Sequence, residues 1–507
     1  MTSPGTDTAG EGETVERVVI PEPSGPLAER RSFRKLLCLM AMFGPGAIVA
    51  SIAIGAGETI VVFRAGSWAG YDLLWVVLLA CLVKGVFLTY LLGRYTAISG
   101  EHVGHRLVRL PGPRGWFLLL IVVLELAIAP LIWAAIAKPC GDLFRHLLAV
   151  AQQDPAARAV WANLLTTAFV ALACGFGLLL SFERLERQQL VICGILVGGT
   201  IIGTLMVRPD FGEALLGCLN FGRLPEKLPP WTPADARQHS LLTVATVFGY
   251  VGGTTMGYLV YAHWIDLHGW GLTGHEKIEA VRRRALAHAE IDYLPDDPEQ
   301  VRRLRGSVAP LRWDAGMGAL VLFIVSGAFM MAGAAVLYPM LASGELTAGF
   351  QGWDLLTDQA HVWRGIHPWL VWVYYVCIIA ALWGTLQALP EAYARVTQEF
   401  FQAIWPRRPW SYHKIRLVIC VYLFITTSIL VWSGASFDLL IQIASFLVSN
   451  LGLALVMWAA LYLNHKLPPA YRTRWPVLAG GVLSAVALTA FAAISGWGLA
   501  VKLLGGG

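Results

Sequence analysis

The chain has 507 residues, of which 56% are hydrophobic and only 14% are charged. Soluble proteins usually carry about 25% charged residues, so this composition excludes an ordinary soluble protein. The formal net charge of +5 is concentrated in a few loops, a pattern that bears on membrane orientation and gives no reason to expect a nucleic-acid partner.

The chain begins with a polar segment rich in Gly, Pro, Thr and Glu. Its first 29 residues lack the basic and apolar regions of a signal peptide. We therefore expect residues 1–34 to form a disordered cytoplasmic tail.

Eleven apolar segments follow this tail. Crossing the hydrocarbon core takes roughly 20 residues in a helix, whereas a β-barrel would show alternating segments of about 10 residues. We therefore predict an all-α membrane protein with spans near 36–65, 71–98, 115–137, 159–180, 188–207, 240–267, 314–340, 367–403, 412–433, 436–464 and 474–504.

The loops between these segments alternate in basic content. Basic residues precede the first span and follow the second, fourth, sixth, eighth and tenth, as in "EAVRRRALAHAE" after the sixth. Because positively charged loops stay in the cytoplasm, we predict a multi-pass protein of the plasma membrane with a cytoplasmic N-terminus and an extracellular or periplasmic C-terminus. The stretch "LTGHEKIEAVRRRALAHAEI" either lies along the membrane surface or forms a solvated helix.

Two spans carry helix-weakening residues at their centres. The first contains "GAGE" at 55–58, and the sixth contains "GGTTMG" at 252–257. Interrupted segments at corresponding positions of two halves are typical of transporters built from inverted repeats, with the site near the midplane. We therefore expect repeats at 35–207 and 240–464, an extracellular loop at 208–239, a basic cytoplasmic loop at 268–313, and an eleventh helix within 465–507.

Glu58 places a carboxylate beside the first interruption. An uncompensated carboxylate at mid-helix costs roughly 2.5–3.5 kcal/mol on insertion scales, so a cation, a proton or Lys84 should compensate it. The freed carbonyls of the interruption could ligate the same cation. In the alternative, both features are purely structural: the glycines only allow close helix packing, and Glu58 is paired with another side chain.

Several segments keep the order and spacing of a known family. "GPGAIVASIAIGAGE" leads without a gap to "GYDLLWVVLLA", followed by "ERLE" at 183–186, "VRPDFGEALLG" and "GGTTMGYLVYAHW". Over most of residues 40–465 the chain resembles the Nramp family of proton-coupled divalent-metal transporters. The resemblance implies a LeuT-like fold of two inverted five-helix repeats plus an eleventh helix, and secondary transport of a cation such as Mn²⁺ or Fe²⁺.

The resemblance also implies a metal site that has been rewritten. Gly55 and Glu58 stand at the positions of the family's metal-binding Asp and Asn. Met256 matches its metal-binding Met, with a backbone carbonyl from the position of Gly253. Tyr258 replaces the first histidine of the sixth span.

The positions implied for coupling are only partly retained. His263 matches the second histidine and Glu125 matches an acid of the third span, but Leu131 stands where the proton-accepting Asp would be. Asn450 corresponds loosely to a polar residue of the tenth span. Proton coupling would therefore follow a non-standard route.

The residues of the sixth-span interruption could also have purely structural roles. The Met256 thioether favours transition metals over Mg²⁺ or Ca²⁺, but a lone Met in an apolar helix is usually packing. Thr254 and Thr255 either ligate through their hydroxyls or bond back to helix carbonyls. Tyr258 either hydrogen-bonds near the site or acts as a gate.

Three other ionisable groups are candidates for coupling. Lys84 and Glu125 lie inside apolar spans, where such groups are functional hypotheses by default. They could pair, with Lys84 as a fixed positive charge in place of a coupling cation, or Lys84 could snorkel to an interface. His263 could shuttle protons or be a satisfied structural histidine. Glu391 receives no role.

Other functions remain open. The same scaffold could carry Mg²⁺, an amino acid or another organic solute, or act as a sensor. The chain lacks HExxH, Gly-x-Ser-x-Gly and nucleotide-binding motifs, so we predict no enzyme and no cofactor beyond a transported metal ion. Expected partners are the bilayer and a small cation or solute, with the chain a monomer or loose dimer. Cys140 and Cys218 either pair or remain free thiols.

Overall fold

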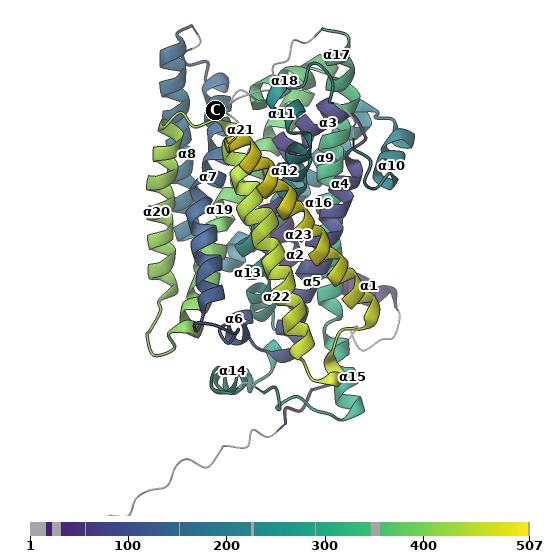
Figure 1. Ribbon diagram of the computed structural model, residues 1–507, viewed down its shortest axis with the longest axis vertical. Helices are drawn as coiled ribbons and strands as arrows, with labels where there is room; N and C mark the ends of the chain where they lie inside the picture. Colours follow the sequence, from purple (N-terminus) through teal and green to yellow (C-terminus); the bar gives the residue numbers. More distant parts are fainter. Residues whose placement is uncertain are drawn as a thin grey trace, which may run out of the picture.

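The computed structural model describes residues 17–22, 32–55, 57–151, 153–224, 228–288, 290–345 and 355–504, and every regular element in these ranges is a helix. Figure 1 shows a bundle of long helices running between two ends. Most of the predicted tail lies outside the described residues. Residues 17–22 differ from that prediction, because Val18 and Ile20 are buried and the Val18 amide donates to the Tyr293 carbonyl at 3.0 Å.

Nine uninterrupted helices within the described ranges are long and apolar enough to cross a membrane. They correspond to predicted spans two to five and seven to eleven, and the two spans missing from the set are the interrupted ones. The nine run over Leu74–Ser99 (α4, η3 and α5), Trp116–Leu147 (α7), Pro155–Leu179 (α8), Phe182–Val207 (α9), Pro298–Ala342 (α15, α16, η5 and α17), Leu370–Ile404 (α19), Tyr412–Trp432 (α20), Phe437–Lys466 (α21, η6 and α22) and Trp475–Leu504 (α23).

Four of the spans contain π-helical turns. In a π turn the backbone hydrogen bond reaches one residue further than in an α-helix, and such turns are frequent at functional sites. They occur at η2 (Gly57–Val62), η3 (Cys81–Leu88), η5 (Gly333–Leu337) and η6 (Ser445–Gly452). Two of these turns carry Glu58 and Lys84.

The first predicted span is divided at two places rather than one. It consists of α1 (Phe33–Ala41), α2 (Pro45–Ala53), η2 and α3 (Phe63–Ala69), and α1 is bent by 53° from α2. Pro45 begins α2, where its missing N–H is not needed and its fixed φ suits the helix start. The second division lies between Ala53 and Gly57, as the glycines predict.

The sixth span is divided as predicted. It consists of α12 (Ser240–Tyr250) and α13 (Thr255–Leu267). Gly252 has φ +103°, a conformation that L side chains rarely adopt. Thr254 then caps α13, since its hydroxyl accepts from the Gly257 amide at 3.3 Å.

Gly252→Ala is expected to destabilise the protein and reduce transport. The positive φ costs an L residue on the order of 1–3 kcal/mol. The new Cβ would also lie 2.6 Å from the Tyr258 hydroxyl and 3.2 Å from the Lys84 Cδ. Thermal unfolding in detergent measures the effect. Gly327→Ala is the matched control because its Cβ would meet no atom within 4 Å; equal Tm values for the two variants would contradict the expected strain.

The short helices gather at the two ends of the bundle. In Figure 1, α6 (Val103–Leu107), α14 (Ile278–Ala287) and α15 (Pro298–Ser307) lie at the lower end, which is the predicted cytoplasmic side. The upper end carries α10 (Phe211–Leu219), α11 (Ala234–Gln238), α17 (Tyr338–Ala342) and α18 (Leu355–Ile366). All eight cysteines are free, so Cys140 and Cys218 do not pair.

Candidate functional site

The Glu58 carboxylate joins the two interrupted helices. It is fully buried, and its oxygens accept from the Gly55 amide at 3.0 Å and the Gly252 amide at 2.9 Å. One side chain therefore connects the break of the first span to the break of the sixth. A carboxylate offers about four lone-pair positions, so these two bonds leave room for further ligation.

The two breaks approach each other closely because one of the glycines has no side chain. A Cβ on Gly57 would lie 2.3 Å from the Tyr250 carbonyl oxygen at the end of α12. Any larger residue at this position would push η2 away from α12. The "GAGE" glycines thus permit both the interruption and the contact that brings Glu58 to Gly252.

Lys84 is the cation of this region. Its ammonium is buried and donates to the carbonyls of Phe248 at 2.6 Å, Gly249 at 2.9 Å and Val251 at 2.9 Å. The last carbonyls of a helix have no partner within the helix and carry partial negative charge. Lys84 therefore caps the C-terminal end of α12. The snorkelling alternative is wrong, and no ion pair joins Lys84 to Glu125 among the described side chains.

Met256 and Tyr258 lie on the first turns of α13, directly after the second break, and both are fully buried. The Tyr258 hydroxyl accepts from the Gly253 amide at 3.3 Å, so the ring folds back over the break. The Thr255 hydroxyl donates to the Val448 carbonyl at 2.6 Å. It therefore bonds to the tenth span instead of to its own helix.

Asn450 is turned toward a different part of the bundle. Its amide donates to the Ala245 carbonyl at 3.1 Å and to the Ser495 hydroxyl at 2.8 Å. These partners belong to the middle of α12 and to α23. The side chain links these two helices, and its hydrogen bonds do not reach the breaks.

Glu125 lies on α7, against the start of α13. The Thr254 hydroxyl, the Met256 amide and the Tyr393 hydroxyl surround its carboxyl group. Neither carboxyl oxygen has a hydrogen bond of good geometry within the described part of the chain. The carboxyl group therefore lies among hydroxyl and amide donors at the start of α13.

His263 belongs to a cluster near the predicted cytoplasmic end. Its Nε2 lies 2.6 Å from a Glu399 oxygen, and its ring stacks on that of His102 at 4.7 Å between centroids. Burial, followed by the neighbouring imidazoles of His263 and His105, lowers the pKa of His102 well below its usual range. One donor atom from each of His102, His263 and Glu399 lies within 4.8 Å of the others, a set that could hold a transition metal.

Comparison with known proteins assigns the chain to a family. The model of the natural resistance-associated macrophage protein-like family, Nramp, matches residues 46–498. The chain belongs to the Nramp family. This is a family of membrane transporters and not of enzymes, as the motifs predicted.

One curated relative has a name that bears on substrate. The divalent metal cation transporter MntH of Acidiphilium cryptum is 28% identical over 276 residues, which is 53% of this chain and 54% of the relative. The chain thus spans about half the length of the curated relative it matches.

Solved structures confirm the Nramp fold. The Eremococcus coleocola manganese transporter, in complex with an aromatic bis-isothiourea substituted compound, is 14% identical and has a TM-score of 0.65, with 97% of this chain and 92% of that chain covered. A mutant of the same transporter is 16% identical over the same shares and has a TM-score of 0.64. The predicted all-α, LeuT-like membrane fold is therefore confirmed.

Two side chains that the sequence did not single out hold α2 of this Nramp protein in place. Asp314, on α16 (Ala309–Ala332), accepts from the Gly44 amide at 3.0 Å and the Gly46 amide at 2.6 Å. At the other end of α2, the Thr385 hydroxyl donates to the Ile52 carbonyl at 3.1 Å. An acid at the start of a predicted span was a usable signal for Asp314, whereas a lone threonine in an apolar run gives none.

A cavity of about 120 Å³ lies on the predicted extracellular side of the Nramp site. Its lining includes Val61, one turn beyond Glu58 in η2, and Thr246 of α12. An ion pair between Arg64 and Asp438, 2.7 Å long, also borders it. The cavity therefore borders the first and sixth spans on the predicted extracellular side of the breaks, with a charged pair at its wall.

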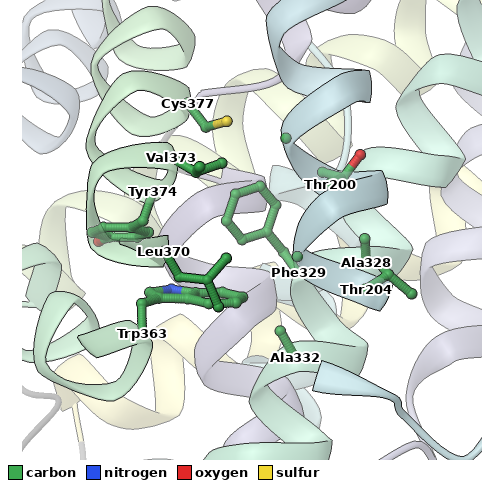
Figure 2. A pocket seen from close by; sticks show the side chains of 12 residues that line it. Thr200, Thr204, Ala328, Phe329, Ala332, Trp363, Leu370, Val373, Tyr374 and Cys377 are labelled. Atoms are coloured by element: carbon green, nitrogen blue, oxygen red, sulfur yellow. The ribbon is translucent and has the colours of Figure 1, made fainter. Parts of the chain in front are cut away.

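Figure 2 shows a second, smaller pocket between α9, α16, α18 and α19. Its volume is about 40 Å³, and Phe329, Trp363 and Leu370 dominate its wall. No carboxylate, imidazole or ammonium group lines it. A cation would find no charged ligand there, so this pocket is not the transport site.

Proposed function

We propose that this Nramp protein is a secondary transporter that moves a divalent metal cation across the plasma membrane by alternating access. The observation that carries the proposal is the buried Glu58 carboxylate between two broken helices. It supplies a full negative charge at the point where backbone groups are freed from helical hydrogen bonds. Hydration lost by a cation on entry would be replaced by this carboxylate and by those backbone oxygens.

The names of similar proteins support a metal as the substrate. The curated relative is named a divalent metal cation transporter, and the similar structures are of a manganese transporter. The soft sulfur of Met256, beside the second break, favours Mn²⁺ or Fe²⁺ over Mg²⁺. Gly253 would contribute its carbonyl on one side of Glu58. The Gly55 carbonyl accepts from the Thr59 amide at 3.2 Å and from the Thr59 hydroxyl at 2.8 Å, and it would contribute on the other side once the cation replaces these bonds.

Proton coupling would then follow a route through Glu125 and His263. Leu131 cannot accept a proton, whereas Glu125 sits in contact range of the start of α13 and His263 pairs with Glu399. Glu125 lies on α7 beside the start of α13, and His263 lies further along α13 toward the predicted cytoplasmic end. Lys84 would act as an internal positive charge.

A second candidate substrate follows from Lys84 itself. Its ammonium adds a positive charge close to Glu58, which weakens the attraction of the pocket for a doubly charged ion. The same scaffold with a partly neutralised pocket would suit an amino acid or another organic solute, and Mg²⁺ remains a further alternative among cations.

Flux measurements in proteoliposomes separate these candidates. Purified protein is reconstituted, and uptake is measured for Mn²⁺, Mg²⁺ and a panel of amino acids, each with and without a pH gradient. Saturable Mn²⁺ uptake above that of empty liposomes supports the proposal. Uptake of an organic solute that needs no metal, without Mn²⁺ flux, would overturn it.

Met256→Ala is expected to lower the preference for Mn²⁺ over Mg²⁺ by roughly five- to tenfold, since loss of a soft ligand weakens binding of the transition metal alone. Competition of Mg²⁺ against Mn²⁺ uptake measures the ratio. Met457→Ala is the matched control because Met457 is equally buried and its truncation carries the same cavity cost. Unchanged preference in Met256→Ala would mean that its sulfur only packs.

A further inference from the structure

A large cavity in the described part of the chain lies away from the breaks. It measures about 390 Å³ and opens between α5 (Thr89–Ser99), α15, α16 and the segment that leads into α23. Five arginines line it: Arg94, Arg305, Arg312, Arg472 and Arg474. No Asp or Glu is part of the lining.

Three of the five guanidinium groups, those of Arg94, Arg305 and Arg472, are held by neutral partners. Arg94 donates to the Asn464 side chain at 2.7 Å and to the Tyr471 carbonyl, and Arg305 donates to the Ala470 carbonyl. None of the five forms an ion pair with a carboxylate of the described chain. Arranging five like charges around one space is unfavourable unless an anion enters it.

Arg312 and Arg474 are the two that the fold does not engage. Both are exposed, and neither side chain donates a hydrogen bond within the described ranges. A guanidinium group presents a rigid fork of donors that matches two oxygens of a phosphate. These two side chains are therefore free to close on a phosphate in the cavity.

The lining residues place the cavity toward one end of the bundle. They include Arg305 of α15, the helix at the lower end in Figure 1, which is the predicted cytoplasmic side. Trp475 follows Arg474 directly and is 78% exposed. Exposed tryptophans mark the interface between hydrocarbon and headgroups, so the arginines face the depth at which phosphates are found.

The wall of the cavity on the bilayer side is apolar. Val86 and Phe87 of η3, Gly316 of α16 and Val477 of α23 line it beside the arginines. A Cβ on Gly316 would meet no atom within 4 Å. An acyl chain attached to a phosphate in the arginine cluster has an apolar path along these residues.

We propose that this cavity binds an anionic glycerophospholipid, with its phosphodiester among the five arginines and an acyl chain along Phe87, Gly316 and Val477. Basic pockets between transmembrane helices on the cytoplasmic side bind anionic headgroups for the same reason. The bound lipid joins α5, α16 and α23. The inference is independent of the transported substrate.

Native mass spectrometry and thermal unfolding of the purified full chain in neutral detergent test this inference. Phosphatidylglycerol and cardiolipin should remain bound and raise Tm, whereas phosphatidylcholine should not. Inorganic phosphate and glycerol phosphate are measured in parallel. Protection by these soluble phosphates equal to that by the lipids would overturn the lipid assignment.

Three variants locate the effect. R312A/R474A should lose at least tenfold in retained phosphatidylglycerol, while R407A/R408A, which removes two exposed arginines of another cytoplasmic loop, should retain it. Gly316→Phe keeps every charge and should also lose the lipid by filling the acyl path. Equal retention by R312A/R474A and R407A/R408A, or full retention by Gly316→Phe, would overturn the inference.

Discussion

Glu58→Gln is expected to abolish saturable Mn²⁺ uptake. The amide has nearly the shape of the carboxylate and can still accept a hydrogen bond from the Gly55 or Gly252 amide, but it lacks the charge that holds a divalent ion. Removing one partner of a buried, desolvated charge pair costs about 3–5 kcal/mol. The expected loss of Mn²⁺ affinity is therefore roughly a hundredfold or more.

Calorimetric titration of Mn²⁺ and flux in proteoliposomes measure this loss. Glu58→Asp keeps the charge on a shorter side chain and should retain part of the uptake, while Glu213→Gln on the exposed helix α10 should behave as wild type. The Tm of each variant shows that the fold is intact. Wild-type Mn²⁺ affinity in a folded Glu58→Gln protein would remove Glu58 from the site and with it the transport proposal.

The broken helices could be predicted because their cause is local. Glycines at 55, 57, 252 and 253 weaken a helix wherever they stand, and the matching order of the two halves placed them opposite each other. The close contact of Gly57 with the Tyr250 carbonyl then follows from packing. The basic content of each loop can also be read locally. The basic loops and the other loops were predicted on opposite sides, and the bundle has two ends that correspond to these sides.

The contacts of individual side chains were predicted less well than the breaks. The π turns are one reason. Each π turn inserts an extra residue into the helical repeat, which rotates the following residues by about 100° relative to an uninterrupted α-helix. Lys84 lies in η3 and Asn450 in η6. Face assignment by helical spacing therefore could not show that Lys84 meets the end of α12, or that Asn450 turns toward Ser495.

The cluster around His263 was missed in part for a different reason. His102, His263 and Glu399 come from three segments more than 100 residues apart, and nothing local marks their contact. His263 was singled out by resemblance alone. No role was predicted for His102 and Glu399 from the sequence, because isolated polar residues near the ends of helices are common.

Replacing Lys84 by Met is expected to stop transport and to lower stability by several kcal/mol. The apolar side chain fills similar space but donates nothing, so the carbonyls of Phe248, Gly249 and Val251 lose their shared donor. Each buried polar group left without a partner costs about 1–3 kcal/mol. In addition, the partial negative charge at the C-terminal end of α12 and the carboxylate of Glu58 would no longer have the Lys84 ammonium to offset their repulsion.

Chemical rescue distinguishes a fixed internal cation from a purely structural lysine. Lys84→Ala leaves a space lined by the three carbonyls, and added methylammonium or Na⁺ should restore part of the Mn²⁺ uptake and raise Tm. Lys138→Ala is the matched control, because Lys138 is half-buried and also donates to a backbone carbonyl, that of Val431 at 3.3 Å. Uptake by this variant should not respond to either cation. If Lys84→Met transports Mn²⁺ at the wild-type rate, the end of α12 needs no positive charge, and Lys84 does not replace a coupling ion in this protein.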